Sequence, residues 1–281
     1  MNAIETKGLS KAYNDFKLDD INLVLPSGCI MGLVGENGAG KSTTIRLIMN
    51  AIKADGGQVA VMSVDNRSKE FSLLKEDIGV VLDEAYFPEV LNAKNVNSVM
   101  KNTYSNWNEK QYFEFLEKFS LPLKKKFKDY SRGMKMKLAI AAALSHDPKL
   151  LILDEATSGL DPMVRDEMLD IFNDFTRDEN HSVLLSSHIV SDLEKICDYI
   201  AFIHKGKLFF CEEKDMLLEK YGVARMSRAD FEALPKEAVK GKKVTNYGVE
   251  ALVLKDAVPD ALPLERAGVE DIILFTAKED K

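Results

Sequence analysis

The stretch that decides the fold reads Gly35-Glu36-Asn37-Gly38-Ala39-Gly40-Lys41-Ser42-Thr43. It follows an apolar run at residues 29–34 and precedes residues 44–49, whose apolar side chains suit a buried helix. A strand, a glycine-rich turn and a helix in this order form the context that a phosphate-binding loop requires. Glycine lets the backbone come close to a ligand, so consecutive N–H groups and the helix N-terminus would point at one anion. The sequence therefore predicts a phosphate cradle here.

Two side chains at the end of this loop indicate which phosphates it binds. Lys41 supplies a mobile positive charge for the β- and γ-phosphates of a nucleotide. Ser42 offers a hydroxyl to Mg²⁺. A glycine-rich turn with a chance Lys-Ser pair is the plain alternative, but it explains neither the order of the residues nor their apolar flanks.

The composition limits the possible partners. The formal net charge of −7 lacks the strongly basic footprint of a nucleic-acid binder, so we expect no nucleic-acid partner. Cys29, Cys197 and Cys211 contain no CxxC pair, which predicts reduced core residues. The N-terminus lacks the apolar core of a signal peptide, and the apolar runs are far shorter than the roughly 20 residues of a membrane helix. We expect a soluble chain that reaches a membrane only through a partner.

The order of the remaining patterns predicts an α/β fold. The apolar run at residues 150–153 and the strand pattern at residues 182–186 are typical of parallel strands that are covered on both faces. Residues 88–148 are mostly helical in pattern, and an aromatic stripe at residues 112–119 indicates core packing. The texture changes near residue 222, and residues 222–281 suggest a small α+β appendage.

Two carboxylates follow the apolar run at residues 150–153. Ligands of open α/β sheets bind at the carboxyl ends of the strands, which is where Asp154 and Glu155 stand. Asp154 is expected in the Mg²⁺ shell, and Glu155 is expected to orient or deprotonate the attacking water. His188 follows another buried strand and is expected to contact the γ-phosphate and hold the water. Taken singly, each of these residues has a structural explanation, and the phosphate loop favours the functional one.

A second anion site is predicted at the start of the helix that follows Tyr130. Ser131 and the backbone N–H of Gly133 would form it. One chain rarely needs two triphosphate cradles for one nucleotide, whereas two copies arranged head to tail would need both. Asp161, in the segment after the acid pair, would lie at such an interface. In a polar loop, Tyr13 is either a half-buried aromatic or a flat surface for an adenine ring.

Together these motifs resemble the nucleotide-binding subunits of ATP-binding-cassette (ABC) transporters. Residues 35–42 resemble the Walker A loop, and residues 130–135 the signature motif. Residues 150–155 resemble Walker B, and residues 158–161 the D-loop. His188 matches the switch histidine, and Tyr13 the aromatic residue that stacks on adenine. The motifs occur in the family order within about residues 1–215.

The resemblance implies a P-loop NTPase core, a mostly parallel sheet with an antiparallel β subdomain. Residues 1–221 would form this ATPase domain, with a helical subdomain at about 88–148. Residues 222–281 would form a small dimerisation or regulatory domain. The resemblance also implies ATP and Mg²⁺ as cofactors and a homodimer, or a pair with a related ATPase subunit. A separate membrane-spanning permease would hold the cytoplasmic chain at the inner face of the cell membrane.

Two positions depart from the family pattern. The signature has Arg132 and Met134, where the commonest form reads Ser-Gly-Gly-Gln. Arg132 would add a positive charge near the partner's nucleotide or would point away from it. Residues 78–84 align with the Q-loop, but Asp83 stands where Gln is expected. A carboxylate 4 Å from a phosphate oxygen would be repelled by about 4 kcal/mol at an effective dielectric constant near 20. We therefore expect Asp83 to act through Mg²⁺ or water, or to turn away.

These departures, the stand-alone chain and the appendage most resemble the ATPase subunits of bacterial exporters of the multidrug, bacitracin and lantibiotic types. The expected function is the coupling of ATP-driven dimer closure to the export of a drug, peptide or lipid-like substrate. The alternative is an ABC-type ATPase that serves a soluble partner complex, such as one for iron–sulfur assembly.

Overall fold

A computed structural model describes residues 1–83, 87–246 and 248–279. Glu84, the last residue of the stretch that aligns with the Q-loop, lies outside these ranges. So do Asp280 and Lys281 at the end of the predicted appendage.

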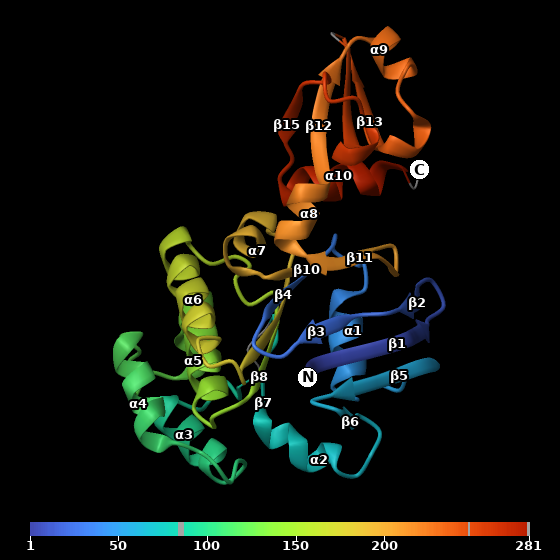
Figure 1. The fold of residues 1–281 in the computed structure, drawn as a ribbon. Helices are drawn as coiled ribbons and strands as arrows, with labels where there is room; N and C mark the ends of the chain where they lie inside the picture. The colour runs from blue at the N-terminus through green and yellow to red at the C-terminus, as the bar shows by residue number, and fades with distance from the viewer. Residues whose placement is uncertain (84–86, 247, 280–281) are drawn as a thin grey trace.

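A large mixed sheet forms the centre of the molecule (Figure 1). Its order is β6-β5-β1-β2-β11-β10-β4-β9-β8-β7, with β3 paired to β1. Its strands are β1 (Asn2–Ala12), β2 (Lys17–Ile21), β3 (Val24–Pro26), β4 (Ile30–Val34), β5 (Gly56–Val61), β6 (Val64–Asp65), β7 (Ile78–Val81), β8 (Leu150–Asp154), β9 (Ser182–Ser187), β10 (Tyr199–His204) and β11 (Lys207–Glu213). Strands β10, β4, β9, β8 and β7 pair with one another in parallel, while β1, β2, β3, β5 and β6 pair with one another antiparallel. Strand β11 connects the two groups, because it pairs antiparallel with β10 and parallel with β2. The expected α/β fold with an antiparallel β part is thus observed.

Strand β8 shows why an all-apolar run forms here. Successive side chains of a strand point to opposite faces of the sheet. Leu150 and Ile152 join the apolar cluster that contains the helix α1 (Lys41–Ile48), whereas Leu151 and Leu153 join the cluster on the other face. Helices α5 (Arg132–Leu144), α6 (Pro162–Phe175) and α7 (Val190–Ile196) contribute to that second cluster. Both faces of the strand are therefore buried, as in parallel sheets generally.

The segment expected to be helical contains α3 (Ala93–Lys101), α4 (Glu109–Lys118) and α5, with the 3₁₀ turn η2 (Phe127–Asp129) between the last two. Short helical turns α2 (Phe71–Leu74) and η1 (Lys75–Asp77) precede β7. The aromatic stripe is confirmed as core, because Tyr112, Leu116 and Phe119 are all buried. The Tyr112 hydroxyl donates to the carbonyl of Ala93, which ties α4 to α3.

A second, smaller sheet follows helix α8 (Lys214–Lys220). Its order is β13-β14-β12-β15, and its neighbours are all antiparallel. Its strands are β12 (Tyr221–Met226), β13 (Val239–Thr245), β14 (Gly248–Leu254) and β15 (Leu264–Arg266). Helix α9 (Arg228–Glu232) and the turns η3 (Lys236–Ala238) and η4 (Lys255–Ala257) lie in its connections, and α10 (Val269–Glu279) ends the described chain.

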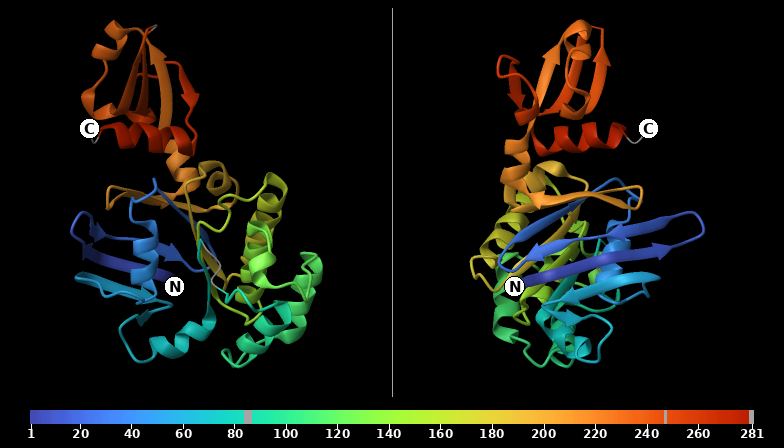
Figure 2. Two further views of the ribbon diagram at one scale, coloured as in Figure 1. Left: turned by 180° about the vertical axis from the view of Figure 1, so that it is seen from behind. Right: turned by 45° about the vertical axis from the view of Figure 1, so that its right-hand side comes forward.

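Helix α10 joins this smaller sheet to the rest of the molecule. It lies between the smaller sheet and the central sheet in Figure 2, and it packs against β13 on one side and α7 on the other. Ile272 of α10 and Leu193 of α7 belong to one apolar cluster. Within the described ranges, no helix combines the length and the apolar character that crossing a bilayer requires.

Candidate nucleotide site

The glycine-rich loop connects β4 to α1, as the sequence predicts. A Cβ atom at Gly35 would lie 2.3 Å from the carbonyl oxygen of Ile203, so the sharp exit from the strand admits only glycine. Gly40 has a φ of +118° and caps α1 without a side-chain hydrogen bond. The first N–H groups of an α-helix have no partner within the helix, so an uncapped N-terminus attracts anions. The loop therefore fits a phosphate group.

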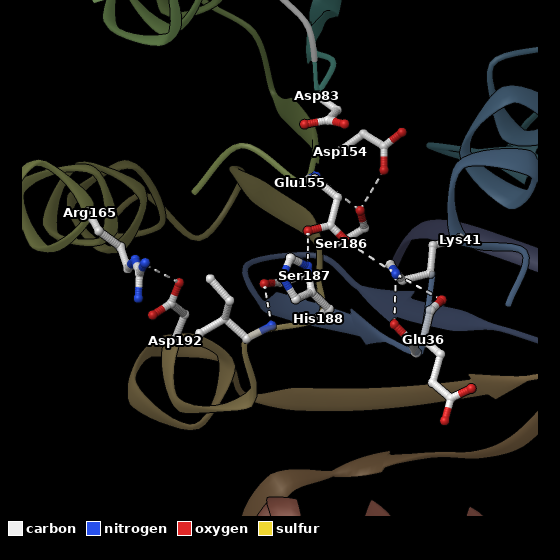
Figure 3. A network of polar contacts seen from close by, with 12 residues as sticks. Glu36, Lys41, Asp83, Asp154, Glu155, Arg165, Ser186, Ser187, His188 and Asp192 are labelled. Carbon is white, nitrogen blue, oxygen red and sulfur yellow. Dashed lines mark hydrogen bonds and ion pairs between the residues drawn. The ribbon is translucent and has the colours of Figure 1, made fainter. Parts of the chain in front are cut away.

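Lys41 is buried at the bottom of this loop, with 5% of its surface exposed. Its Nζ donates to the carbonyl oxygens of Gly35 (2.7 Å) and Glu36 (3.3 Å). It also lies 3.0 Å from Oε1 of Glu155, an ion pair that lacks hydrogen-bond geometry. The ammonium thus faces the loop and the catalytic candidate Glu155 at the same time (Figure 3).

Asp154 and Glu155 are held by Ser186 of the neighbouring strand. The Ser186 hydroxyl donates to Oδ1 of Asp154 (2.6 Å) and accepts from the backbone N–H of Glu155 (3.1 Å). Glu155 adopts a φ of +52°, a region that costs a non-glycine residue roughly 1–2 kcal/mol. The two hydrogen bonds from the Glu155 N–H to Ser186, one to Oγ and one to the carbonyl oxygen, stabilise that conformation.

His188 is bound to the other oxygen of the Glu155 carboxylate. Its Nδ1 lies 2.7 Å from Oε2 of Glu155. A carboxylate only accepts hydrogen bonds, so Nδ1 carries a proton and Nε2 is the ring atom that remains for a ligand. The structure thus brings together three residues that the sequence predicts separately, Lys41, Glu155 and His188 (Figure 3).

Tyr13 lies in the loop between β1 and β2 and is half exposed. Its ring centroid is 6.5 Å from that of Phe16, and Lys11 Nζ is 5.8 Å above the ring. Phe16 in turn reaches within 3.1 Å of the position of a Cβ at Gly40. An exposed aromatic face is therefore connected to the phosphate loop through Phe16, a residue that the sequence analysis missed.

Ser131 and Asp161 each cap a helix. The Ser131 hydroxyl accepts from the N–H of Met134 (3.3 Å) at the start of α5, and Asp161 accepts from the N–H of Val164 (3.1 Å) at the start of α6. Both residues are exposed. Among the described residues, no hydrogen bond joins Ser131 or Gly133 to residues 35–43 of the same chain. Within the described residues, Ser131 and Gly133 are therefore not part of the hydrogen-bonded network of the phosphate loop.

The comparisons with known proteins agree with this geometry. The sequence profile described as ABC transporter matches residues 18–158. A bacitracin transport ATP-binding protein, BcrA of Bacillus licheniformis, is 36% identical over 208 residues, which are 73% of this chain and 68% of that protein. The chain belongs to the ABC transporter family.

Further relatives and solved structures are also similar to this ABC protein. A lantibiotic transport ATP-binding protein, SrtF of Streptococcus pyogenes, is 32% identical over 215 residues, which are 75% of this chain and 91% of that protein. The structure of an ATP-binding subunit of an ABC transporter is 26% identical, with a TM-score of 0.69, and covers 76% of this chain and 91% of its own. A dimeric bacterial ABC transporter cassette shares the fold, with 22% identity, a TM-score of 0.68 and coverage of 75% and 98%. The chain is thus an ATP-binding ATPase subunit of this family.

In this ABC ATPase, the Q-loop position does not stand alone. Strand β7 pairs with β8 so that Val81 lies opposite Leu153, which places Asp83 beside the acid pair. Oδ1 of Asp83 accepts a hydrogen bond from Nη2 of Arg132 (3.0 Å). Asp83 and Arg132, which both depart from the family pattern, are therefore hydrogen-bonded to each other. The two motifs taken separately do not predict this contact.

A second pair that the sequence analysis missed links the helices after His188 and Asp161. Arg165 of α6 lies 3.8 Å from Asp192 of α7, and its Nη2 donates to the carbonyl of Leu160 (3.3 Å). Asp192 is 5% exposed, and burial raises the pKa of its carboxyl group, while the Arg165 guanidinium opposes the shift. The only signal in the sequence is an acidic residue four positions after His188, which is too common to predict a contact.

Proposed function

We propose that this ABC ATPase is the subunit that hydrolyses ATP for an exporter whose substrate crosses the membrane through a separate permease. The observation that carries the proposal is the Glu155 carboxylate, which bridges Lys41 and His188 at the carboxyl end of the parallel strands. The relatives named for bacitracin and lantibiotic transport support export of a drug, peptide or lipid-like substrate. An ATPase that serves a soluble partner complex is not favoured, because these relatives are named as transport proteins.

The donor groups also fit Mg²⁺. The Ser42 hydroxyl and the Asp154 carboxylate are hard oxygen donors of the kind that Mg²⁺ prefers. Together with the phosphates, the ion would neutralise charge that develops during phosphoryl transfer. The remaining tasks belong to the chain. Lys41 binds phosphate oxygens, Glu155 accepts the proton of the attacking water, and Nε2 of His188 orients that water.

Glu155→Gln tests the proposal. The variant keeps the shape of the side chain but removes its basicity, so ATP binding persists and turnover falls by about 10²–10⁴-fold, the scale of a lost general base. Binding is measured by equilibrium titration and turnover by phosphate release. Glu167→Gln is a matched control, because Glu167 forms a similar pair with Lys137 (2.7 Å) on the outer helices. Near-normal turnover of Glu155→Gln would overturn the assignment.

We also propose that two copies, or this chain and a related subunit, enclose ATP between the phosphate loop of one and Ser131 and Gly133 of the other. The exposed position of Ser131 at the start of α5 supports this arrangement. Specific ATPase activity is then expected to rise with protein concentration as dimers form. A constant activity down to a concentration at which light scattering shows only monomers would contradict it. The permease would hold such a dimer at the cytoplasmic face of the cell membrane.

Residues 222–281 are proposed to form a dimerisation or regulatory domain. Helix α10 packs on α7, the helix that follows His188, so a change in this domain has a direct route to the site. Ile272→Ala, in the cluster shared with α7, is expected to lower stability by about 2–5 kcal/mol and to change turnover. Val253→Ala, in the separate apolar cluster of the smaller sheet, is expected to change stability only. Equal effects of both variants on turnover would contradict the proposed role.

A further inference from the structure

Arg132 contacts two loops besides the helix that it begins. Its Nη2 donates to Asp83, in the loop after β7. Its guanidinium also lies against Gly159, in the loop between β8 and α6, where a Cβ atom would be 2.9 Å from Nη1 and 3.0 Å from Cζ. Arg132, which belongs to the stretch that resembles the signature motif, thus contacts a residue of the Q-loop and a residue of the D-loop.

Gly159 gives the guanidinium its place. The residue has a φ of +67°, and it carries no Cβ that would push Arg132 away. A planar guanidinium can lie flat on a peptide surface and still donate a hydrogen bond from its edge, which a lysine ammonium cannot do. The arrangement therefore uses the shape of arginine as well as its charge.

The loop that contains Gly159 connects Glu155, on the phosphate side of the site, to Asp161 at the start of α6. It begins after Glu155 and ends at Asp161, the cap of α6. Arg132 itself stands between Ser131 and Gly133 at the start of α5. A contact between Arg132 and Gly159 therefore fixes the position of the α5 N-terminus relative to the loop that follows Glu155.

We propose that Asp83, Arg132 and Gly159 form a latch within one protomer, and that Arg132 is a positioning residue for ATP hydrolysis. The latch fixes the position of the α5 N-terminus relative to the loop that follows Glu155. Ser131 and Gly133 are then correctly placed to contact the partner's nucleotide. The inference rests on the proposed function, because it assumes that α5 closes over a nucleotide. Both charged side chains are about half exposed, at 54% and 53%, so the pair is weak enough to re-form in each cycle.

A competing role for Arg132 is direct contact with the partner's phosphates. In the latch, Arg132 and Asp83 act through each other, so removing one makes the other ineffective. In direct phosphate contact, Arg132 acts alone, and removing Asp83 frees it. The two roles therefore predict different couplings between the variants.

The experiment is a double-mutant cycle on the full-length chain with Asp83→Ala, Arg132→Ala and the double variant, scored by kcat and KM for ATP. Each single variant is expected to lower kcat by about three- to five-fold, the range of an exposed ion pair, with KM changed less than about two-fold. The double variant is expected to match the singles. Arg132→Lys is expected to recover kcat only in part, because the charge returns without the planar group.

Asp65 and Arg67 give a matched control pair, joined at 3.3 Å with exposures of 51% and 54% and placed before α2. Alanine variants of this pair are expected to leave kcat unchanged. Losses that multiply in the double variant, or unchanged kcat in both singles, would overturn the latch. A loss above about 100-fold in Arg132→Ala with normal Asp83→Ala would instead show direct phosphate contact. Failure of the proposed function is recognised separately, as absent wild-type hydrolysis or normal turnover in Glu155→Gln.

Discussion

The candidate site has a phosphate side, around Lys41 and Glu155, and a signature side, around Ser131 and Asp161. The two sides differ in burial and in the number of contacts that one chain provides. On the phosphate side, Lys41 and Glu155 are 5% and 9% exposed, and hydrogen bonds to backbone and to His188 fix their positions. On the signature side, Ser131, Arg132 and Asp161 are exposed, and their contacts are two helix caps, one half-exposed ion pair and the packing of Arg132 on Gly159. The first half is therefore held in place by contacts within one chain, whereas the second has few such contacts.

This difference has a chemical consequence for Glu155. Burying an ion pair costs desolvation energy, which close partners and additional hydrogen bonds offset. Here Lys41 and His188 occupy both oxygens of the carboxylate. Phosphate oxygens in the loop would compete with Oε1 of Glu155 for the same ammonium group. The contact between Lys41 and Glu155 is therefore expected to lengthen when the phosphate loop is occupied.

The largest effect is expected on the buried side. Lys41→Ala removes the charge that faces the phosphates and is expected to lower kcat/KM by about 10²–10³-fold, the scale of a lost transition-state donor. Phosphate release measures the change. Lys137→Ala is the matched control, since Lys137 is also a poorly exposed lysine paired with a glutamate. A decrease in kcat/KM of less than ten-fold in Lys41→Ala would contradict the expectation that the buried side of the site contributes more to hydrolysis than the exposed side.

A smaller effect is expected on the exposed side. Ser131→Ala is expected to lower turnover by about ten-fold or more, because a hydrogen bond to a charged group contributes about 1.5–3 kcal/mol. Ser227→Ala is the control, because the Ser227 hydroxyl caps α9 in the same way, accepting from the N–H of Asp230 (3.2 Å). Loss of a cap costs either variant about 0.5–2 kcal/mol of stability. Equal turnover in the two variants would show that Ser131 acts only as a cap.

The smallest effect is expected where the two halves are joined, at Asp192. Burial raises the pKa of this carboxyl group above its value in the unfolded chain. Between the two pKa values the folded chain binds more protons than the unfolded chain, so the folded state loses stability as the pH rises through this range. Asp192→Asn cannot ionise and lacks this loss. The melting temperature of the variant relative to wild type is therefore expected to be higher at pH 7 than at pH 4. An equal difference at both pH values would contradict the expectation.

Much of the fold and of the site follows from consecutive residues. The glycine-rich loop, the acids after β8 and the histidine after β9 are each recognisable because strand, turn and helix preferences act over a few neighbouring residues. The smaller sheet was predicted only as an α+β appendage. Residues 249–254 form part of β14, and residues 272–275 form part of α10, although both are short apolar runs. Short apolar runs fit either structure, so only packing between segments decided these cases.

The sequence by itself determined that this chain has a nucleotide-phosphate loop, because the glycines, Lys41 and Ser42 that make it are adjacent. It also determined the acids and the histidine that such a loop requires. Only the tertiary structure decided that Glu155 is shared by Lys41 and His188, that Asp83 binds Arg132, and that Arg165 meets Asp192. The order of the parallel strands, β10-β4-β9-β8-β7, differs from their order in the chain. Residues far apart in sequence therefore become neighbours only after the crossover helices have packed, and no local pattern records which ones will meet.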